Sequence, residues 1–393
     1  MKITGVEQIE VAIPWNRPLI RVHDAVPWTH QHSTIIKVHT DEGITGISEA
    51  PFSREFSQSF INSRVIGSDP FEIEKLIGTS ILQGTTPTAV ATVEAACWDI
   101  IGKSLNVPVY RLLGGRFWDR VPITITTSTE SPEVVIKEAE HAVKQGINTI
   151  KTKVGENLKL DLDIVRGVRE AVGDSVNIRV DPNQHWSVPT AINNINRMAK
   201  YYPQYIEQPI PAYDLDGFKR VRDRVPVPLT VCDASPRHTE VIRLIKREAI
   251  DFVSSDPDRT GGLWGWKKLD AICTASGIPL VCHVNGAGVS TAIWLQAVVT
   301  SPSCIYAHDI DCSNLGVSKT LVDDIITKPF KHENGFLQPP EGPGLGVELD
   351  EAKMTKYSEL AKEQRREGSK THGENFRSSP NLTLVGYGYP PRY

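Results

Sequence analysis

The middle of the chain alternates between short apolar runs and longer amphipathic stretches. Eight runs have the length and composition of strands, at 121–127, 149–154, 177–182, 205–209, 228–233, 252–257, 279–283 and 305–309. Stretches such as 132–145, 161–172 and 188–201 lie between them and show the apolar spacing of helices. Strands that alternate with helices in this way predict an α/β fold, a parallel barrel over residues 121–338.

The flanking parts of the chain follow a different pattern. Residues 2–13 alternate as a strand does, 33–49 have the pattern of a hairpin, and 88–105 carry an apolar face at helical spacing. We therefore expect residues 1–120 to form a separate α+β domain. Residues 339–393 begin with a glycine-rich turn followed by a charged helix, and we expect this segment to pack on the first domain.

Composition argues against several classes of protein. The 393 residues carry a formal net charge of −4 with mixed signs, so no basic surface for nucleic acid is indicated. The first residues lack the apolar segment of a signal peptide, and no later stretch has the length and apolarity of a membrane span, which together predict a cytoplasmic protein. The six cysteines show no CxxC pairing, which favours buried free thiols over disulfides or zinc ligands.

Polar residues recur where the predicted barrel strands end. They are Lys153, Asp181, Glu207, Asp233, Asp256, His283 and Asp309. One acid at such a position is commonly only the cap of the next helix, and one strand lysine is commonly a surface residue. A succession of seven instead predicts a single polar site, because the chemistry of parallel barrels collects at the carboxyl ends of the strands.

Two lysines stand two residues apart in the second predicted barrel strand. In a strand the side chains of Lys151 and Lys153 share one face. Ammonium groups crowded together and directed at carboxylates indicate a base whose pKa is lowered by its neighbour. The residues alone therefore favour an enzyme that removes a proton next to a carboxylate.

A set of fragments across nearly the whole chain resembles the enolase superfamily, specifically its mandelate racemase and glucarate dehydratase branches. The fragments are Ala95-Ala96-Cys97-Trp98-Asp99, Lys151-x-Lys153, Asp181-Pro182-Asn183, Glu207-Gln208-Pro209, Asp233, Asp256-Pro257, His283-x-Asn285 and Gly342-Pro343-Gly344-Leu345-Gly346. Their order and spacing carry the resemblance. It implies a modified (β/α)7β barrel, an N-terminal capping domain completed by C-terminal residues, and a requirement for Mg²⁺.

By this resemblance Asp181, Glu207 and Asp233 match three metal ligands on successive strands. The chemistry agrees, since three carboxylates at one barrel mouth need a hard cation to offset their repulsion. The alternative is that these acids only cap helices or pair with lysines.

The resemblance also assigns the acid and base groups. Lys153 matches the family's base, and Lys151 beside it binds the substrate carboxylate. His283 matches a second base across the barrel, whose imidazole Asp256 would hold in the needed tautomer. A lone histidine would more often be structural.

Further residues are candidates for substrate binding. Asn285 resembles a substrate-binding asparagine of the glucarate dehydratase branch, and Asp309 matches an acidic position at the eighth strand. We add Asn183, which follows the first proposed ligand. In the first domain a polar loop region contributes His23, Trp28 and Arg54 as contacts for hydroxyls or a distal carboxylate.

The expected reaction is Mg²⁺-dependent dehydration of a sugar acid, an aldonate or aldarate, to a 2-keto-3-deoxy acid. A racemase, epimerase or cycloisomerase working through the same deprotonated carboxylate is the alternative. Departures from the family pattern, such as Ala234-Ser235 after Asp233, leave the substrate open. A Schiff-base aldolase and a non-catalytic sugar-acid binding protein are more remote. The resemblance further implies a homo-oligomer.

Overall fold

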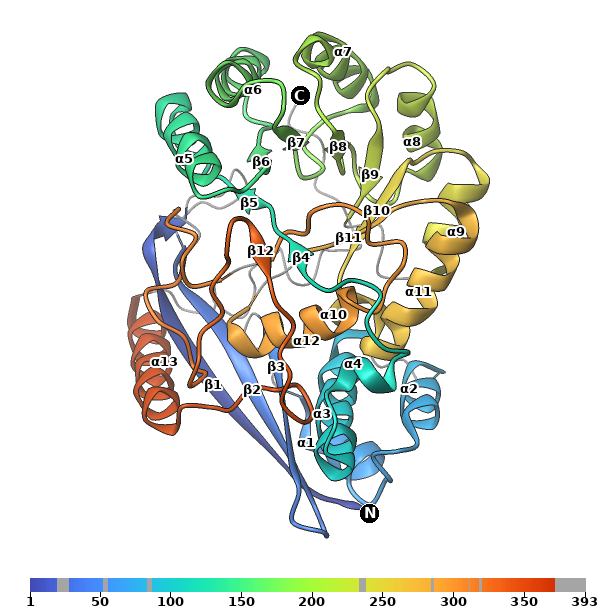
Figure 1. Cartoon of the computed structure of the whole chain (residues 1–393), viewed down its shortest axis with the longest axis vertical. Helices are drawn as coiled ribbons and strands as arrows, with labels where there is room; N and C mark the ends of the chain where they lie inside the picture. Colours follow the sequence, from blue (N-terminus) through green and yellow to red (C-terminus); the bar gives the residue numbers. More distant parts are fainter. Residues whose placement is uncertain are drawn as a thin grey trace.

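The structure is a computed structural model, and it describes residues 1–19, 28–51, 56–82, 87–232, 238–283, 286–310, 312–317 and 320–371. Figure 1 shows a curled sheet with helices around it, and beside it a second body formed by the start of the chain. We call this second body, residues 1–112, the capping domain. The boundaries at 120 and 338 remain predictions.

The capping domain is a three-stranded antiparallel sheet with helices beside it. Its strands, in spatial order, are β1 (Ile3–Leu19), β2 (Trp28–Thr40) and β3 (Thr45–Pro51). The helices are α1 (Gln58–Phe60), the π-helix η1 (Ile61–Val65), α2 (Ile73–Leu82), α3 (Pro87–Leu105) and α4 (Val109–Leu112). The predicted hairpin is β2 and β3, and the predicted helix at 88–105 is α3, which is buried throughout residues 90–102.

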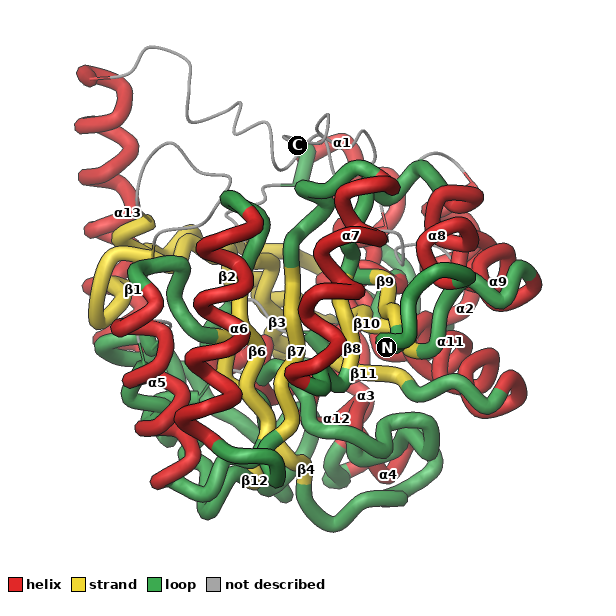
Figure 2. The backbone as a smooth tube through the Cα atoms, turned by 90° about the horizontal axis from the view of Figure 1, so that it is seen from above, coloured by secondary structure: helices red, strands yellow, loops and turns green. Residues whose placement is uncertain are grey.

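Seven parallel strands form the curled sheet, in the order β5 to β11. They are β5 (Ile125–Thr126), β6 (Thr149–Lys153), β7 (Asn177–Asp181), β8 (Tyr205–Glu207), β9 (Leu229–Val231), β10 (Phe252–Ser255) and β11 (Leu280–Cys282). The helices between them are α5 (Pro132–Lys144), α6 (Leu158–Val172), α7 (Val188–Met198), the 3₁₀ turn η2 (Ala199–Tyr201), α8 (Leu215–Arg222), α9 (His238–Lys246), α10 (Pro257–Thr260) and α11 (Leu263–Ser276). Helix α12 (Gly288–Val298) follows β11. Figure 2 shows α6 and α7 outside strands β6 to β8, as the alternation predicted.

The eighth predicted strand, 305–309, is wrong as a strand. Its residues make only single bridges, Ile123 with His308 and His283 with Asp309. Tight turns limit the extended run, because Ile305 N donates to Ser303 O and Ile310 N donates to His308 O. The segment still joins the two edges of the sheet. Thr124 N, just before β5, donates to His308 O at 2.7 Å, and Asp309 N donates to Cys282 O of β11 at 2.9 Å.

The first predicted barrel strand is also shorter than expected. Residues 121–127 divide into β4 (Val121–Pro122), which pairs outside the barrel with β12 (Phe336–Leu337), and β5. Pro122 has no N–H to donate to a ladder, and Ile123 N turns to Gly335 O.

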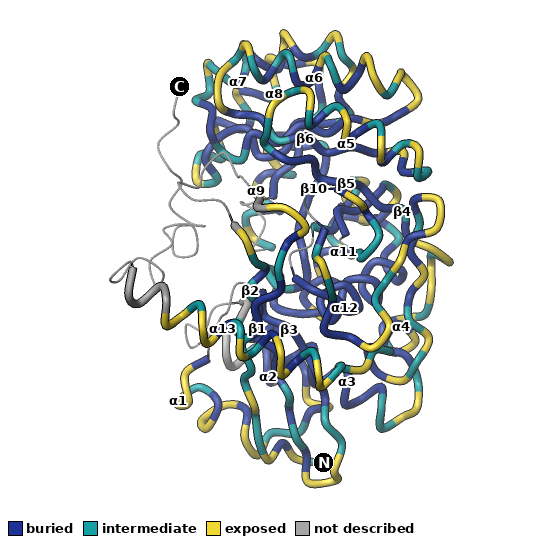
Figure 3. Tube along the Cα trace, turned by 90° about the vertical axis from the view of Figure 1, so that its left-hand side faces the viewer, coloured by how far each residue is buried: buried dark blue, intermediate teal, exposed yellow. Residues whose placement is uncertain are grey.

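Burial follows the layers seen in Figure 3, where the barrel strands are dark blue and the outer faces of the helices are yellow. Helix α12 is the exception among the barrel helices, since all its residues are buried. All six cysteines are free and five are buried, as predicted. Within the described ranges no helix is long and apolar enough to cross a membrane.

The C-terminal helix α13 (Glu351–Thr371) lies along β1. Arg365 Nε pairs with Glu10 Oε2 at 2.5 Å, and Lys37 Nζ pairs with Glu351 Oε1 at 2.7 Å. Helix α13 therefore packs on the sheet formed by the beginning of the chain.

A single buried carboxylate joins α3 to two distant segments. Asp99 accepts hydrogen bonds from Ile47 N at 2.9 Å, Leu345 N at 2.8 Å and Lys103 Nζ at 2.5 Å. A Cβ on Gly344, whose φ is +69°, would lie 2.1 Å from Asp99 Oδ1, so only glycine allows this approach. Two fragments on which the resemblance rested, at 95–99 and 342–346, thus meet in space.

Asp99→Ala should lower the free energy of unfolding by about 2–5 kcal/mol, because it leaves two buried N–H groups without their acceptor. The partly exposed ammonium of Lys103 keeps its bond to Thr45 O, so its loss of Asp99 adds little. Urea unfolding followed by circular dichroism measures this loss. Asp163→Ala is the control, since it removes an exposed pair with Arg166 and should cost less than about 0.5 kcal/mol. Equal unfolding midpoints for the two variants would contradict the role given to Asp99.

Candidate active site

The lysine pair of β6 points into the barrel, as alternation predicted. Both ammonium groups reach the same oxygen of Asp181, with Lys151 Nζ at 3.2 Å and Lys153 Nζ at 2.5 Å from Oδ2. Lys151 is 1% exposed, whereas the Lys153 side chain is 20% exposed. The two lysines therefore differ in depth. Lys151 lies inside the site and Lys153 at its opening.

Lys151 is surrounded by carboxylates from three parts of the barrel. Its Nζ lies 2.7 Å from Glu207 Oε1 and 3.4 Å from Asp309 Oδ2, besides the contact with Asp181. Burial disfavours the charged amine, but the three carboxylates outweigh this effect and raise the pKa of Lys151 well above its ordinary value. Lys151 is therefore a fixed cation.

The pKa values of the two carboxylates that end β7 and β8 shift in opposite directions. Burial opposes the charge of Asp181, yet Lys153 and Lys151 together lower its pKa to about 2. For Glu207 burial is the larger effect and raises the pKa, although Lys151 opposes it. Both side chains are almost completely buried.

Asp181 and Glu207 fit a hard cation. Both offer carboxylate oxygens from adjacent strand ends, and both already lie within 3.2 Å of one positive charge, Lys151 Nζ. Such oxygens are the ligands that Mg²⁺ prefers. The third predicted ligand, Asp233, lies outside the described residues, and among those described no group of three potential ligands is gathered. The three-ligand set remains a prediction.

Unusual backbone conformations end these strands and turn the chain toward the site. Asn183 has a backbone φ of +44° and Gln208 a φ of +41°, values that residues other than glycine rarely adopt. Asn183 accepts a hydrogen bond from Lys153 Nζ through Oδ1 at 2.7 Å, and its N donates to Asp181 Oδ1 at 2.9 Å. Strain at such positions is common at functional sites.

His283 and Asp309 meet where the barrel closes. His283 Nε2 lies 3.8 Å from Asp309 Oδ2, the oxygen that also approaches Lys151. The second oxygen, Asp309 Oδ1, accepts from Thr126 Oγ1 at 2.9 Å. Asp309 thus links the histidine to the lysine cluster.

Asp256 lies beside His283 through the sheet, because His283 N donates to Ser255 O at 2.9 Å. Its carboxylate caps α10 by accepting from Arg259 N at 2.7 Å, and Oδ2 pairs with Arg259 Nε at 3.1 Å. The predicted contact between Asp256 and the His283 imidazole remains a prediction.

The remaining predicted contacts cannot be placed. His23, Arg54 and Asn285 lie outside the described residues, and Trp28 begins β2 with a side chain that is not described.

Thr126, which the sequence did not single out, and Arg259 also contact the site. Thr126 holds Asp309, and Arg259 pairs with Asp256. The sequence offered two signals: strand alternation places the Thr126 side chain on the inward face, and Asp256 and Arg259 are three residues apart.

Models of two protein domains match the chain. One, described as "Enolase C-terminal domain-like", matches residues 134–353, and the other, described as "Mandelate racemase / muconate lactonizing enzyme, N-terminal domain", matches residues 7–114. The chain is an enzyme of the enolase superfamily, in its mandelate racemase and muconate lactonizing branch. The resemblance in the sequence is thereby confirmed, and so is the fold of a barrel with an N-terminal capping domain.

Relatives of this superfamily member catalyse several reactions. N-succinyl-L-Arg/Lys racemase of Bacillus cereus is 30% identical in sequence over 375 residues, which cover 89% of this chain and 96% of that protein. The solved structure of N-succinyl Arg/Lys racemase from Bacillus cereus superposes with a TM-score of 0.83 at 28% identity, and the match covers 91% of this chain and 98% of that one. D-galactonate dehydratase of Variovorax paradoxus is 27% identical over 91% of this chain and 94% of that protein. The dipeptide epimerase of Enterococcus faecalis, solved with Mg and the dipeptide L-Leu-L-Tyr, gives a TM-score of 0.79 at 26% identity over 88% of this chain and 99% of that one.

Lys151→Met should destabilise the protein in EDTA by about 3–5 kcal/mol, because Glu207, Asp181 and Asp309 then repel one another without a buried cation. Their folded-state pKa values rise. An acid with a raised folded pKa stabilises the fold at low pH and loses that contribution as pH rises, so the loss should be larger at pH 8 than at pH 5. Urea unfolding at both pH values measures it.

Lys153→Met is the matched control, since this ammonium lies at the opening of the site and is partly hydrated. We expect a smaller loss for it. A Lys151→Met loss that is equal at the two pH values, or no greater than that of Lys153→Met, would contradict the buried charge cluster.

Proposed function

We propose that the protein removes the proton α to the carboxylate of a sugar acid with the help of Mg²⁺ and dehydrates the acid to a 2-keto-3-deoxy acid. The observation that carries this proposal is that two chemically different groups, the amine of Lys153 and the imidazole of His283, border the mouth of the barrel. Carboxylates line this mouth, those of Asp181, Glu207 and Asp309. One amine and one imidazole suit a reaction whose two proton transfers differ.

Asp181, Glu207 and Asp233 would hold the metal. Bound there, Mg²⁺ would stabilise the negative charge that develops on the substrate carboxylate. Lys151 would bind the same carboxylate as a fixed cation. Its raised pKa supports binding rather than proton abstraction, and it also argues against a Schiff-base nucleophile, which must be neutral.

Lys153 and His283 would move the protons. Lys153 is partly exposed at the opening and is oriented by Asp181 and Asn183, so it suits the removal of the α proton. Departure of a β-hydroxyl as water requires a proton from an acid. An imidazolium, with an ordinary pKa near neutrality, gives up that proton more readily than an ammonium.

Racemisation or epimerisation is the second candidate. The racemase from Bacillus cereus at 30% identity and the dipeptide epimerase from Enterococcus faecalis favour it. In that reaction one of the two groups would remove the α proton and the other would return a proton to the opposite face of the carbon. The dehydratase from Variovorax paradoxus, at 27% identity, supports the first candidate.

Incubation with Mg²⁺ and a panel of aldonic and aldaric acids should produce a 2-keto acid, detected by semicarbazide derivatisation. EDTA should abolish product formation. Lys153→Ala and His283→Asn should each lower kcat by about 10²–10⁴-fold, the usual contribution of a positioned acid or base. Lys159→Ala, an exposed lysine on α6, should match the wild type.

Absence of product across the panel, together with α-proton exchange into solvent D₂O from an N-acyl amino acid or a dipeptide, would replace dehydration by racemisation or epimerisation. Wild-type rates in both Lys153→Ala and His283→Asn would overturn the proposed pair itself.

A further inference from the structure

Two buried glutamates of the capping domain reach across to the barrel. Glu49 lies in the buried part of β3, and Glu94 lies in the buried part of α3. Glu49 is 4% exposed and Glu94 is 0% exposed. Burial raises the pKa of both side chains, and the hydrogen-bond donors around each carboxylate oppose the rise. Charged groups in such positions need strong partners.

Glu94 holds the start of α11. Its Oε2 accepts from Leu263 N at 2.9 Å, and its Oε1 accepts from Trp264 N at 2.8 Å and from Trp98 Nε1 at 2.7 Å. Backbone N–H groups at the first turn of a helix have no partner within the helix. Glu94 supplies two of them with an acceptor from another domain.

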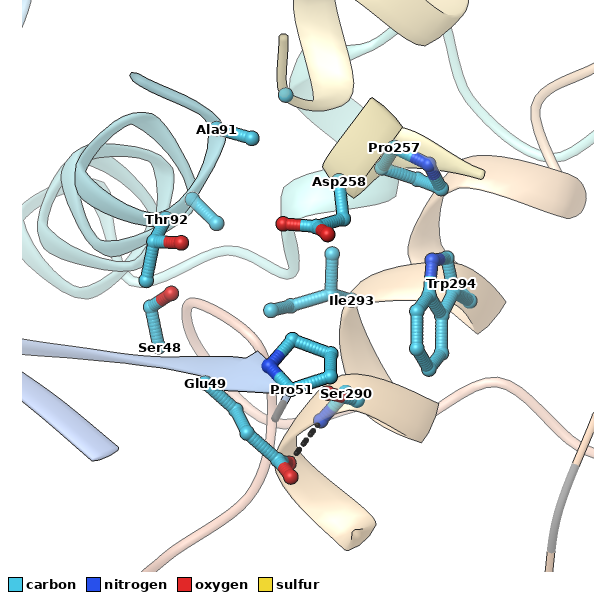
Figure 4. Close-up of a pocket in the computed structure, with 12 residues that line it drawn as sticks. Ser48, Glu49, Pro51, Ala91, Thr92, Pro257, Asp258, Ser290, Ile293 and Trp294 are labelled. Atoms are coloured by element: carbon cyan, nitrogen blue, oxygen red, sulfur yellow. Dashed lines mark hydrogen bonds between the residues drawn. The ribbon is translucent and has the colours of Figure 1, made fainter. Parts of the chain in front are cut away.

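Glu49 holds the start of α12 in the same way. Its Oε1 accepts from Ala287 N at 2.7 Å and from Ser33 Oγ at 2.6 Å, and its Oε2 accepts from Ser290 N at 2.9 Å. Figure 4 shows the hydrogen bond between Glu49 and Ser290 in the wall of a cavity that residues of both domains line, Asp258 among them.

Neither barrel helix caps itself, and each has a glycine where the glutamate approaches. The N-cap residues Gly262 and Ala287 make no side-chain cap bond. A Cβ on Gly262, at φ +108°, would lie 2.2 Å from Glu94 Oε2. One on Gly286, at φ +134°, would lie 2.4 Å from Ser290 Oγ and 2.9 Å from Glu49 Oε1. Both helix starts are therefore shaped to receive a carboxylate from the capping domain.

These two helices follow the segments that carry the predicted His283–Asp256 pair. Asp256 begins a compact turn in which Thr260 N bonds to Asp256 O and Gly262 N bonds to Pro257 O, and Glu94 holds its far end. Glu49 holds Ala287, which comes four residues after His283. Lys153, by contrast, is held within the sheet by β6–β7 pairing opposite Asp181.

We propose that Glu49 and Glu94 are positioning residues that set His283 and Asp256 in place when the capping domain docks, while Lys153 is placed independently. The catalytic part of this inference rests on the proposed function. The positional part does not, and the experiment below separates the two.

The first measurement needs no substrate. Glu49→Gln and Glu94→Gln keep the side-chain shape but turn an NH₂ group toward a backbone N–H donor. The imidazole ¹H–¹³Cε1 NMR signal of His283, identified by its loss in His283→Asn, should shift in both variants. The signal of His141, on α5, should not move. Glu74→Gln is the matched control, because Glu74 also joins the capping domain to α11, through Trp264 Nε1 and Lys268, but at the surface.

The second measurement uses turnover. Glu49→Gln should lower kcat by roughly 10-fold or more, since a small displacement of an acid or base costs rate steeply. When Glu49→Gln is combined with His283→Asn, it should lower the residual rate by less than about 2-fold, because the effects of two substitutions that act through the same group do not add. When Glu49→Gln is combined with Lys153→Ala, it should lower any residual rate by the same factor as in the wild type. General structural damage would instead lower the rate in both backgrounds.

If Glu49→Gln fails to fold by circular dichroism, Ser33→Ala replaces it, since it removes the hydroxyl that donates to Glu49 and leaves both backbone donors in place. If Glu94→Gln fails to fold, the variants at the Glu49 site decide. An unchanged His283 signal in every folded variant overturns the inference. A shifted signal in a protein that turns over no carboxylate supports the positioning role and removes the proposed function alone.

Discussion

A buried positive charge holds the mouth of this barrel together. Lys151 has almost no contact with water, so its ammonium group depends on Glu207, Asp181 and Asp309 for its stabilisation. These carboxylates come from two strands and from the segment that joins the sheet edges. The charges are mutually dependent, because removal of any partner would leave another uncompensated in a medium of low dielectric constant. The same arrangement concentrates oxygen ligands where a divalent cation and a substrate carboxylate would bind.

The contact between the two domains also depends on buried polar groups that need partners. Glu49 and Glu94 are buried carboxylates of the capping domain, and each is satisfied mainly by backbone N–H groups of the barrel. Such contacts are directional, so they fix the orientation of the capping domain more strictly than apolar packing alone would. The fold thereby connects the first domain to the loops that follow β10 and β11.

Much of the barrel and its inward-facing residues could be predicted from the sequence, because both depend on local periodicity. Alternation places Lys151 and Lys153 on one face, and the parallel arrangement brings Asp181 beside them. The ends of strands were less predictable. Gln208 was expected inside a strand, but its left-handed backbone conformation ends β8 at Glu207, and nothing in its side chain signals this. Residues 305–309 have the composition of a strand, yet tight turns on both sides reduce them to single bridges.

The roles of Glu49 and Glu94 were not predictable for another reason. Their acceptor atoms meet donors 238 and 169 residues away, as in the bonds to Ala287 N and Leu263 N. A glutamate on the apolar face of a helix signals an unusual environment, but its partners are backbone groups that carry no residue-specific signal. Only the positions of the glycines beside them, Gly262 and Gly286, hint at a close approach.

A crystal structure with Mg²⁺ and a bound hydroxy-carboxylate would test the account most directly. We predict an ion about 2.0–2.1 Å from oxygens of Asp181 and Glu207. The α carbon of the ligand should lie between Lys153 Nζ and the imidazole of His283. An ion bound elsewhere, with Asp181 and Glu207 still paired only to lysines, or a Lys153 side chain directed away from the ligand, would contradict it.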